Sequence, residues 1–348
     1  MAIETFWAVR ADVLQKLSAF RSRVNVSAED LLYLDDQARV WGAPRAGGAP
    51  IYQDASREWR ELCDQIIRPV ARARPRLPLH RWNTNFEWTP LGRSLRLLDR
   101  QEAEFYDENG WVVLEDAVDP ATVKRLVEES DIAEREGERK LRQMRGSRGF
   151  IARADEITFT THLVNRAPFA REFYKSKLFQ DIGHDFIGPD VRLYWDQAVY
   201  KKPGVEKPFP WHQDNGYTFV EPQNYITCWI GLDEATEENG CMWFVPGVHK
   251  LGTVAHDLTD LGYACYREDP PEAVPVPTRP GTVIVLSGLT PHKTAHNRTD
   301  KVRRALVAQF VPEGAVAVTE DAWGNVTRTV ADRPDRQFKV LAGGAPCP

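Results

Sequence analysis

The sequence predicts a mainly β fold, an antiparallel barrel or sandwich with helices packed on one outer face. After residue 190, short runs of β-branched and aromatic residues follow one another, and such runs favour strands. Clusters of Pro, Gly and Asn separate the runs, which is typical of antiparallel sheets rather than of alternating strands and helices. The predicted strands are VRLYWDQAVY (191–200), NYITCWIGL (224–232), CMWFVP (241–246), GTVIVLSG (281–288) and RALVAQFVP (304–312).

The residues before this β region predict helices and one further strand. EFYDENGWVVLED indicates the end of a helix, an Asn-Gly turn and a strand over 111–114. Asp119 is a natural N-cap for the next helix, with Pro120 at its first position. The highly charged segment 133–153 ends in glycines, which predicts either a solvated helix and loop or a flap over a substrate.

The chain divides into three predicted regions. Residues 1–95 are predicted to form a helical extension, which ends in the connector RPVARARPRLPLHRW (68–82) because Pro at this density blocks regular helix. Residues 96–320 form the predicted β domain, and residues 321–348 form a C-terminal tail. The arginines of the connector have no second basic stretch beside them, so they do not indicate nucleic-acid binding.

Composition indicates a globular protein and argues against several other classes. The chain has 348 residues, of which 42% are hydrophobic and 27% charged, and this supplies enough apolar material for a buried core. The formal net charge of −5 gives no overall attraction to nucleic acid or to anionic membranes. The cysteines are scattered and form no C-x-x-C pair, so neither a disulfide framework nor a thiolate zinc site is indicated.

The sequence predicts a cytoplasmic protein. Charged residues interrupt the N-terminal segment, so no apolar signal core can be drawn, and no run of about 18 apolar residues occurs elsewhere. The expected partner is a small-molecule substrate, without nucleic acid or membrane, and the oligomeric state is left open.

Two histidines and one aspartate are the candidate metal ligands. His212 and Asp214 stand in PWHQDNGY, and side chains two residues apart on an extended strand point to the same face. His292 follows Pro291 at the end of a predicted buried strand. Two His and one carboxylate from separate strands form the facial triad that holds Fe(II) on one side and leaves three positions open.

Arg303 is the candidate for binding a second carboxylate. A 2-oxo acid can occupy two of the open positions with its keto and carboxylate oxygens, which leaves one position for O₂. The remaining carboxylate of 2-oxoglutarate requires a fixed, fork-shaped cation, and Arg provides this geometry where Lys does not. Arg303 lies at the start of the predicted strand that follows His292, next to the proposed ligands.

Four segments resemble the phytanoyl-CoA dioxygenase family and together cover roughly residues 100–315. They are FYDENGWVVLEDAVDPATVKRL (105–126), WHQDNGYT (211–218), TCWIGLDEATEENGCMWFVPGVHK (227–250) and RPGTVIVLSGLTPHKTAHNRTDKVRRAL (279–306). Their order is that of the family, and residues 1–95 lie outside the resemblance.

The resemblance implies a double-stranded β-helix, a jelly roll of cupin type, that uses Fe(II), 2-oxoglutarate and O₂. The implied iron ligands are His212, Asp214 and His292. The implied cosubstrate contacts are Arg303, Thr294, Trp229 and Tyr200.

The predicted function is that of a non-haem Fe(II)/2-oxoglutarate-dependent dioxygenase. It would hydroxylate an unactivated C–H bond of a small molecule or secondary metabolite and release succinate and CO₂. Desaturation, epimerisation and cyclisation stay open, because they differ only in the fate of the substrate radical. Halogenation is not expected, since halogenating relatives replace the carboxylate ligand with a small residue and this chain keeps Asp214.

Two alternatives from other classes also stay open. A zinc hydrolase would use the same ligands with a bound water, but it would leave Arg303 without a role. The other alternative is a cupin-like metal-binding protein without turnover, against which the complete ligand set argues. The loops 133–160 and 215–223 are the expected specificity elements, and the primary substrate is left open.

Overall fold

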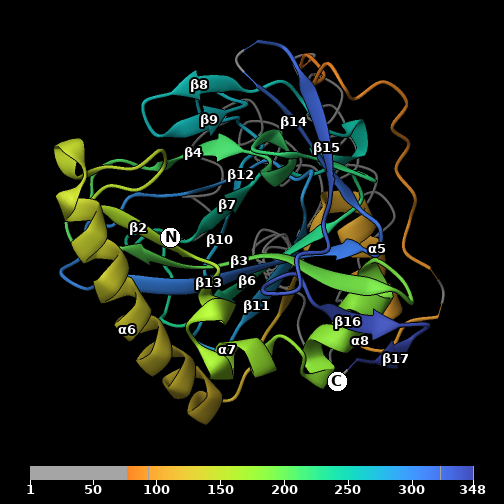
Figure 1. Ribbon diagram of the computed structural model, residues 1–348, viewed down its shortest axis with the longest axis horizontal. Coiled ribbons are helices and arrows are strands. Elements are labelled where there is room, and N and C mark those ends of the chain that lie inside the picture. Colours follow the sequence, from red (N-terminus) through yellow and green to blue (C-terminus); the bar gives the residue numbers. More distant parts are fainter. Residues whose placement is uncertain (1–76, 93, 322, 348) are drawn as a thin grey trace, which may run out of the picture. The chain divides into compact units, whose positions relative to one another are not determined.

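Two antiparallel sheets pack against each other in the computed structural model, which describes residues 77–92, 94–321 and 323–347 (Figure 1). The larger sheet has eight strands and the smaller sheet has four. One hydrophobic cluster contains side chains of both, among them Trp229 and Ile284 from the larger sheet and Phe244 from the smaller. From Pro78 onward the residues belong to one compact unit, and most of the predicted helical extension (1–76) lies outside the described residues.

The larger sheet runs in the order β1, β11, β6, β13, β3, β16, β17, and β2 is also paired with β3. Its strands are Trp111–Leu114 (β1), Ile157–Thr161 (β2), Val191–Lys201 (β3), Ile226–Gly231 (β6), Val283–Ser287 (β11), Arg303–Pro312 (β13), Lys339–Ala342 (β16) and Ala345–Pro346 (β17). The smaller sheet runs β10, β7, β12, β4. Its strands are Phe209–His212 (β4), Met242–Phe244 (β7), Val274–Val276 (β10) and His292–Thr294 (β12).

The larger sheet has an inner face toward the smaller sheet and an outer face covered by helices. Successive side chains of a strand point to opposite faces. In β13, Leu306 and Phe310 therefore pack into the outer cluster, whereas Ala305 packs into the cluster shared by the two sheets. Each large apolar side chain buried in this way stabilises the fold by roughly 1.5–3 kcal/mol.

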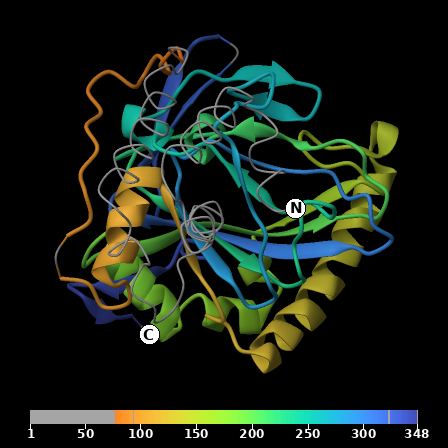
Figure 2. The ribbon, with the colours of Figure 1, turned by 180° about the vertical axis from the view of Figure 1, so that it is seen from behind.

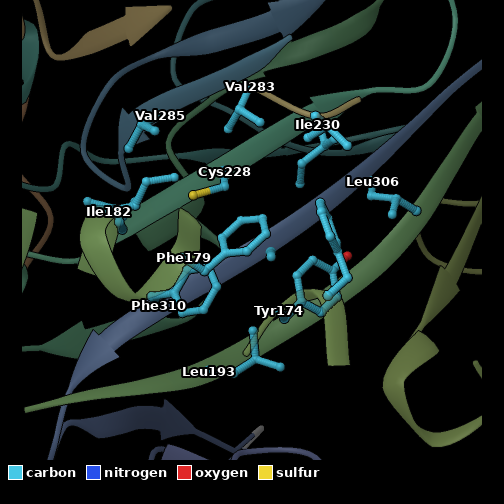
Figure 3. Packing of buried hydrophobic residues seen from close by; sticks show 14 of the residues in the cluster. Tyr174, Phe179, Ile182, Leu193, Cys228, Ile230, Val283, Val285, Leu306 and Phe310 are labelled. Carbon is cyan, nitrogen blue, oxygen red and sulfur yellow. The ribbon is translucent and has the colours of Figure 1, made fainter. Parts of the chain in front are cut away.

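Four α-helices supply the outer layer. They are Arg100–Asn109 (α5), Pro120–Gln143 (α6), Pro168–Phe173 (α7) and Lys177–Phe186 (α8). Phe179 of α8 stacks on Phe310 of β13, with the ring centroids 5.5 Å apart, and Ile182 and Tyr174 complete the contact (Figure 3). The helices α5 and α8 lie side by side when seen from either side (Figures 1 and 2), and Tyr106 contacts Phe186 between them.

Local signals explain where the first two helices begin. The side chain of Asp99 accepts the backbone N–H of Glu102, whose own side chain accepts the N–H of Asp99, so a capping box starts α5. Asp119 caps α6 and Pro120 occupies its first turn, which confirms the predicted start of this helix. Gly110 ends α5 in the left-handed conformation, at φ 95°, where a side chain would also collide with His249.

Smaller strands and 3₁₀ turns complete the described fold. They are the strands Phe219–Glu221 (β5), Val316–Glu320 (β14) and Val326–Val330 (β15), the hairpin Asp257–Thr259 (β8) and Gly262–Ala264 (β9), and the 3₁₀ turns Arg145–Ser147, Leu163–Asn165, Asp214–Gly216 and Val248–Leu251. The segment 321–348, predicted as a tail, supplies β15 to β14 and β16 to β3. No helix among the described residues is long and apolar enough to cross a membrane.

The predicted mainly β fold with helices on one outer face is confirmed. All five long β-rich runs are strands, as β3, β6, β7, β11 and β13. The prediction differs at His292, which opens the separate strand β12, because β11 already ends at Ser287 and a turn intervenes. Short strands such as β4, β10 and β12 escape prediction because three or four residues are too few to show periodicity.

Candidate metal centre

His212, Asp214 and His292 come together at one end of the smaller sheet. His212 is the last residue of β4 and His292 is the first residue of β12, and the two are cross-strand partners. Asp214 begins a 3₁₀ turn just after β4, so it does not lie on the extended strand that the sequence argument assumed. Its Oδ1 lies 3.7 Å from Nε2 of His212 and 3.8 Å from Nε2 of His292, and the three potential ligand atoms all lie within 4.8 Å of one another.

Hydrogen bonds orient each of these side chains. Nδ1 of His212 lies 2.8 Å from the carbonyl oxygen of Pro210, and Nδ1 of His292 lies 2.9 Å from that of Thr290. A carbonyl oxygen only accepts, so each Nδ1 carries the proton and each Nε2 keeps a free lone pair. The hydroxyl of Thr227 donates to Oδ2 of Asp214, which leaves Oδ1 free on the side of the two histidines.

The electrostatics of the group favour metal binding. Burial lowers the pKa of His212 well below its usual value, and His292 close by lowers it further, so the imidazole is neutral as a metal ligand must be. Two neutral nitrogens and one carboxylate oxygen suit Fe(II) and leave positions open for other ligands. The donor set therefore fits the facial triad predicted from the sequence.

Arg303 lies on the inner face, fully buried, with an exposure of 0%. Its three guanidinium nitrogens have no hydrogen-bond partner, and no ion pair to it exists within the described part of the chain. The guanidinium carbon stands 5.7 Å from the ring centroid of Trp229, on the neighbouring strand. Burial lowers the pKa of Arg303 to about 10, because it disfavours the charged form. A buried cation of this kind requires an anionic partner.

Lys201 lies opposite Arg303 in the register of β3 and β13, and sequence reasoning did not place it at the cosubstrate site. Its Nζ donates to Oγ1 of Thr294 at 2.9 Å and to the carbonyl oxygens of Thr294 and Ala295. Burial and the charge of Arg303 lower the pKa of Lys201 well below its usual value. Strand parity groups Lys201 with Val199 and Gln197 on one face, but only the structure shows that this face is the inner one.

The structure brings three of the four predicted cosubstrate contacts together and leaves the fourth apart. On the inner face, Thr294 accepts a hydrogen bond from Lys201, and Trp229 lies against Arg303. Tyr200 points to the outer face, where its hydroxyl donates to Oδ1 of Asp131 on α6 at 2.6 Å. The reason is again strand parity, since Tyr200 and Lys201 are neighbours on one strand.

Two loops meet beside the triad. The ring of Tyr217 lies 5.2 Å from that of His212, and its hydroxyl accepts the backbone N–H of Tyr263 in the β8–β9 hairpin. Phe150, in the loop after α6, contacts Tyr263 at 5.4 Å, and Arg153 of the same loop donates to the carbonyl of Asp260. The glycine-rich end of the predicted segment 133–153 is thus a loop that reaches over to the hairpin, while its first part is the solvated end of α6.

Comparison with known proteins agrees with this geometry. The family model "Phytanoyl-CoA dioxygenase (PhyH)" matches residues 106–305, which is more than half of the chain. The chain belongs to the phytanoyl-CoA dioxygenase family. The family resemblance seen in the sequence is therefore confirmed.

Curated relatives in this family match over part of their length. The methylphosphonate hydroxylase of Gimesia maris is 33% identical over 155 residues, which cover 43% of this chain and 57% of that protein. The phytanoyl-CoA dioxygenase of Arabidopsis thaliana is 29% identical over 161 residues, which cover 45% of this chain and 57% of that protein. The chain thus spans little more than half the length of these relatives.

A solved structure shows the same fold. The epimerase SnoN, in complex with Fe³⁺, α-ketoglutarate and nogalamycin RO, is 19% identical and superposes with a TM-score of 0.53. The match covers 69% of this chain and 97% of that one. Together with the two facing sheets, this likeness confirms the predicted double-stranded β-helix.

Proposed function

We propose that this member of the phytanoyl-CoA dioxygenase family is a non-haem Fe(II)/2-oxoglutarate-dependent dioxygenase that acts on a small molecule. The observation that carries the proposal is the buried guanidinium of Arg303, without a hydrogen-bond partner, on the inner face near a His-Asp-His group. A zinc hydrolase with the same ligands would leave this charge unpaired in its working state. A dicarboxylate cosubstrate would pair it.

Different residues would bind the metal and the distal carboxylate of the cosubstrate. His212, Asp214 and His292 would hold Fe(II). Arg303 would bind the distal carboxylate with two parallel N–H donors, which is the geometry that a guanidinium offers to a carboxylate. Lys201, held in place by Thr294, would add a second cation beside the same carboxylate. In a buried site both contacts gain strength, because little water screens them.

The protein itself would orient the metal ligands and exclude water from the cosubstrate. Bound Fe(II), 2-oxoglutarate and O₂ supply the oxidising chemistry that breaks a substrate C–H bond, with succinate and CO₂ formed from the cosubstrate. Thr227 fixes the carboxylate of Asp214 in one orientation. Trp229, buried against Arg303, shields the distal carboxylate from water.

For the reaction, we infer hydroxylation of an unactivated C–H bond in a small molecule or secondary metabolite. The Gimesia maris relative is named a hydroxylase, whereas the SnoN structure is that of an epimerase, so desaturation, epimerisation and cyclisation remain the alternatives. Retention of Asp214 argues against halogenation, because its carboxylate fills the position that a halide would need.

The first experiment measures stabilisation of the protein by 2-oxoglutarate under anaerobic conditions with Fe(II). The wild type should melt at higher temperature when the cosubstrate is added, by a free energy of about 2.7 kcal/mol at a hundredfold excess over Kd. Arg303→Met should abolish this shift, because it removes the fork-shaped cation and keeps an apolar side chain of similar length.

Arg304→Gln is the matched control. Arg304 is the next residue of β13, but its guanidinium pairs with Asp233 and Asp131. This variant should melt at a lower temperature and still be stabilised by 2-oxoglutarate as strongly as the wild type. A wild type that binds iron but gains no stability from 2-oxoglutarate would refute the dioxygenase proposal and favour the zinc hydrolase.

A further inference from the structure

We propose that the primary substrate carries an anionic group, a carboxylate or a phosphate-like group, which binds beside His162 at the end of the inner face away from Arg303. This inference rests on the proposed function, because it names the substrate class of the same site. It is carried by a row of cross-strand neighbours that leads from Asp214 through Thr227, Gln309 and Trp195 to His162, and by the charges around this histidine.

The row starts at the metal ligand Asp214. Thr227, which donates to Asp214, is the cross-strand partner of Gln309, and Gln309 is the partner of Trp195 on the next strand. Gln309 and Trp195 are partly exposed, whereas Arg303 and Lys201 at the other end of the same strands are buried. The Trp195 end of these strands is therefore more open to solvent than the Arg303 end, and we place substrate entry on that side.

His162 stands at the end of this row. Its ring lies 4.4 Å from that of Trp195, edge to face. Its backbone is in the left-handed region, at φ 53°, and is held there because its N–H donates to the carbonyl of Asp196 and the N–H of Val164 donates to the side chain of Asp196. A non-glycine residue in this conformation is strained, and such strain collects at functional sites.

The imidazole of His162 keeps an unused polar atom. Its Nδ1 is buried and has no hydrogen-bond partner among the described residues. Burial and the surrounding arginines lower the pKa of His162 to about 4, so the ring is neutral near pH 7 and offers one N–H donor. A neutral donor among cations suits an anion, since it adds a hydrogen bond without another charge to desolvate.

Three guanidinium groups and one carboxylate are the charged groups with the largest effect on the pKa of His162. The cations are Arg336, Arg166 and Arg333, and the carboxylate is Asp335. Asp335 pairs with Arg336 at 2.8 Å, while Arg166 and Arg333 form no ion pair in the described part of the chain. These four groups together carry a net positive charge, on a chain whose formal net charge is −5.

The fold holds these arginines at the exposed end of the row. Nη2 of Arg166 donates to the carbonyl of Thr161 at 2.9 Å, beside His162. The loop that carries Arg333 and Arg336 is tied down through Gln337, which accepts the N–H of Arg333 and donates to the carbonyl of Tyr194. Asn165, and Arg171 of α7, also hold this loop, since both donate to Asp335. Arg333 and Arg336 therefore lie at the edge of β3, near the backbone of Tyr194. Guanidinium forks recognise carboxylates and phosphates with two hydrogen bonds each.

Two anion sites thus lie at opposite ends of the inner face. The buried end, at Arg303 and Lys201, suits the cosubstrate carboxylate, and the open end, at His162, suits the anionic group of the substrate. Asp214 of the metal centre is bonded to Thr227, which the sheet register aligns with Gln309 and Trp195. A substrate anchored by its anion at His162 would extend its C–H bonds along Trp195 and Gln309 toward the metal.

The experiment titrates inorganic sulfate into the protein loaded with Fe(II) and saturated with 2-oxoglutarate, without O₂, and follows the heat of binding. Saturation with 2-oxoglutarate fills the Arg303 end, so sulfate reports only on other sites. The wild type should bind sulfate, and Arg333→Gln combined with Arg336→Gln should weaken binding by at least roughly tenfold, since each lost charge-assisted contact is worth about a factor of ten.

His162→Asn should weaken sulfate binding in the same direction, since asparagine tolerates the left-handed backbone but lacks the ring. The matched control is Arg328→Gln, which removes an exposed arginine of β15 that pairs with Glu221 and should leave sulfate binding unchanged. As a second measurement, carboxylic acids should stimulate succinate release from 2-oxoglutarate more strongly than their methyl esters, and the double variant should remove this preference.

The outcomes separate this inference from the proposed function. If 2-oxoglutarate stabilises the wild type through Arg303 but sulfate does not bind, or binds equally to the double variant, the anion site is refuted and the dioxygenase proposal stands. If 2-oxoglutarate gives no stabilisation while sulfate binds in an arginine-dependent way, the anion site is supported and the dioxygenase proposal fails.

Discussion

Lys201 and Arg303 face each other across β3 and β13, and both are buried on the inner face, at 1% and 0% exposure. Lys201 donates only to uncharged oxygens, of Thr294 and Ala295, and Arg303 donates to nothing among the described residues. Two adjacent buried cations without a carboxylate destabilise a folded chain. A bound carboxylate of 2-oxoglutarate would pair with both cations and offset this cost.

The first prediction concerns Arg303→Met in the protein without cosubstrate. The substitution removes an unpaired buried charge and keeps most of its volume, so we expect the free energy of unfolding to stay equal or to rise, by up to about 3 kcal/mol. Urea denaturation of the metal-free protein measures it. A marked loss of stability would show that the guanidinium has a structural partner, in contradiction to its isolation here.

The second prediction concerns the orientation of Asp214. Thr227→Val keeps the shape of the side chain and removes the hydrogen bond to Oδ2 of Asp214. Metal affinity should fall by about 10- to 100-fold, as is typical when a partner of a metal ligand is lost. Calorimetric titration with Mn(II) gives the affinity, and Thr227→Ser should restore most of it. Equal affinity in all three proteins would mean that Asp214 needs no such support.

The third prediction separates Tyr200 from the cosubstrate site. Tyr200→Phe removes the hydrogen bond to Asp131 on α6 and should lower the free energy of unfolding by about 1 kcal/mol. The stabilisation by 2-oxoglutarate should not change, because the hydroxyl lies on the outer face of the sheet. Thermal melts with and without 2-oxoglutarate test both statements, and a loss of the cosubstrate effect alone would place Tyr200 at the site.

The fourth prediction concerns pH and Asp196. Burial raises the pKa of this carboxyl to about 7, far above its value of about 3.9 in an unfolded chain. Between these values the folded protein holds a proton that the unfolded chain has lost, so stability falls as pH rises from about 4 to 7, by up to about 1.4 kcal/mol per pH unit.

Asp196→Asn provides the comparison. It keeps an acceptor for the N–H of Val164 and cannot ionise. The difference in unfolding free energy between variant and wild type should therefore shift in favour of the variant as pH rises from about 4.5 to 7.5. Parallel pH profiles would show that Asp196 titrates at its ordinary pKa.

The sequence alone predicted the strands that are long enough to show a pattern. The runs that became β3, β6, β11 and β13 carry enough β-branched and aromatic residues to be recognised, and Asp119 with Pro120 marked the start of α6. The candidate ligands His212, Asp214 and His292 were named because the motif and the family resemblance mark them, and the structure brings them together. The strand β12, three residues long, carries His292 but no periodicity of its own.

Only the tertiary structure decided which face each strand residue occupies and what it meets there. Strand parity fixes that Tyr200 and Lys201 point to opposite faces, but the sequence does not say which face is the inner one. The pairing of β3 with β13 placed Lys201 beside Arg303, and the pairing of β2 with β3 brought His162 to Trp195. The sequence by itself determined the candidate ligand set and the longer strands, because these depend on residue type and local pattern. The second buried cation and the anion site at His162 depend on contacts between distant segments, which only the register of the folded sheets creates.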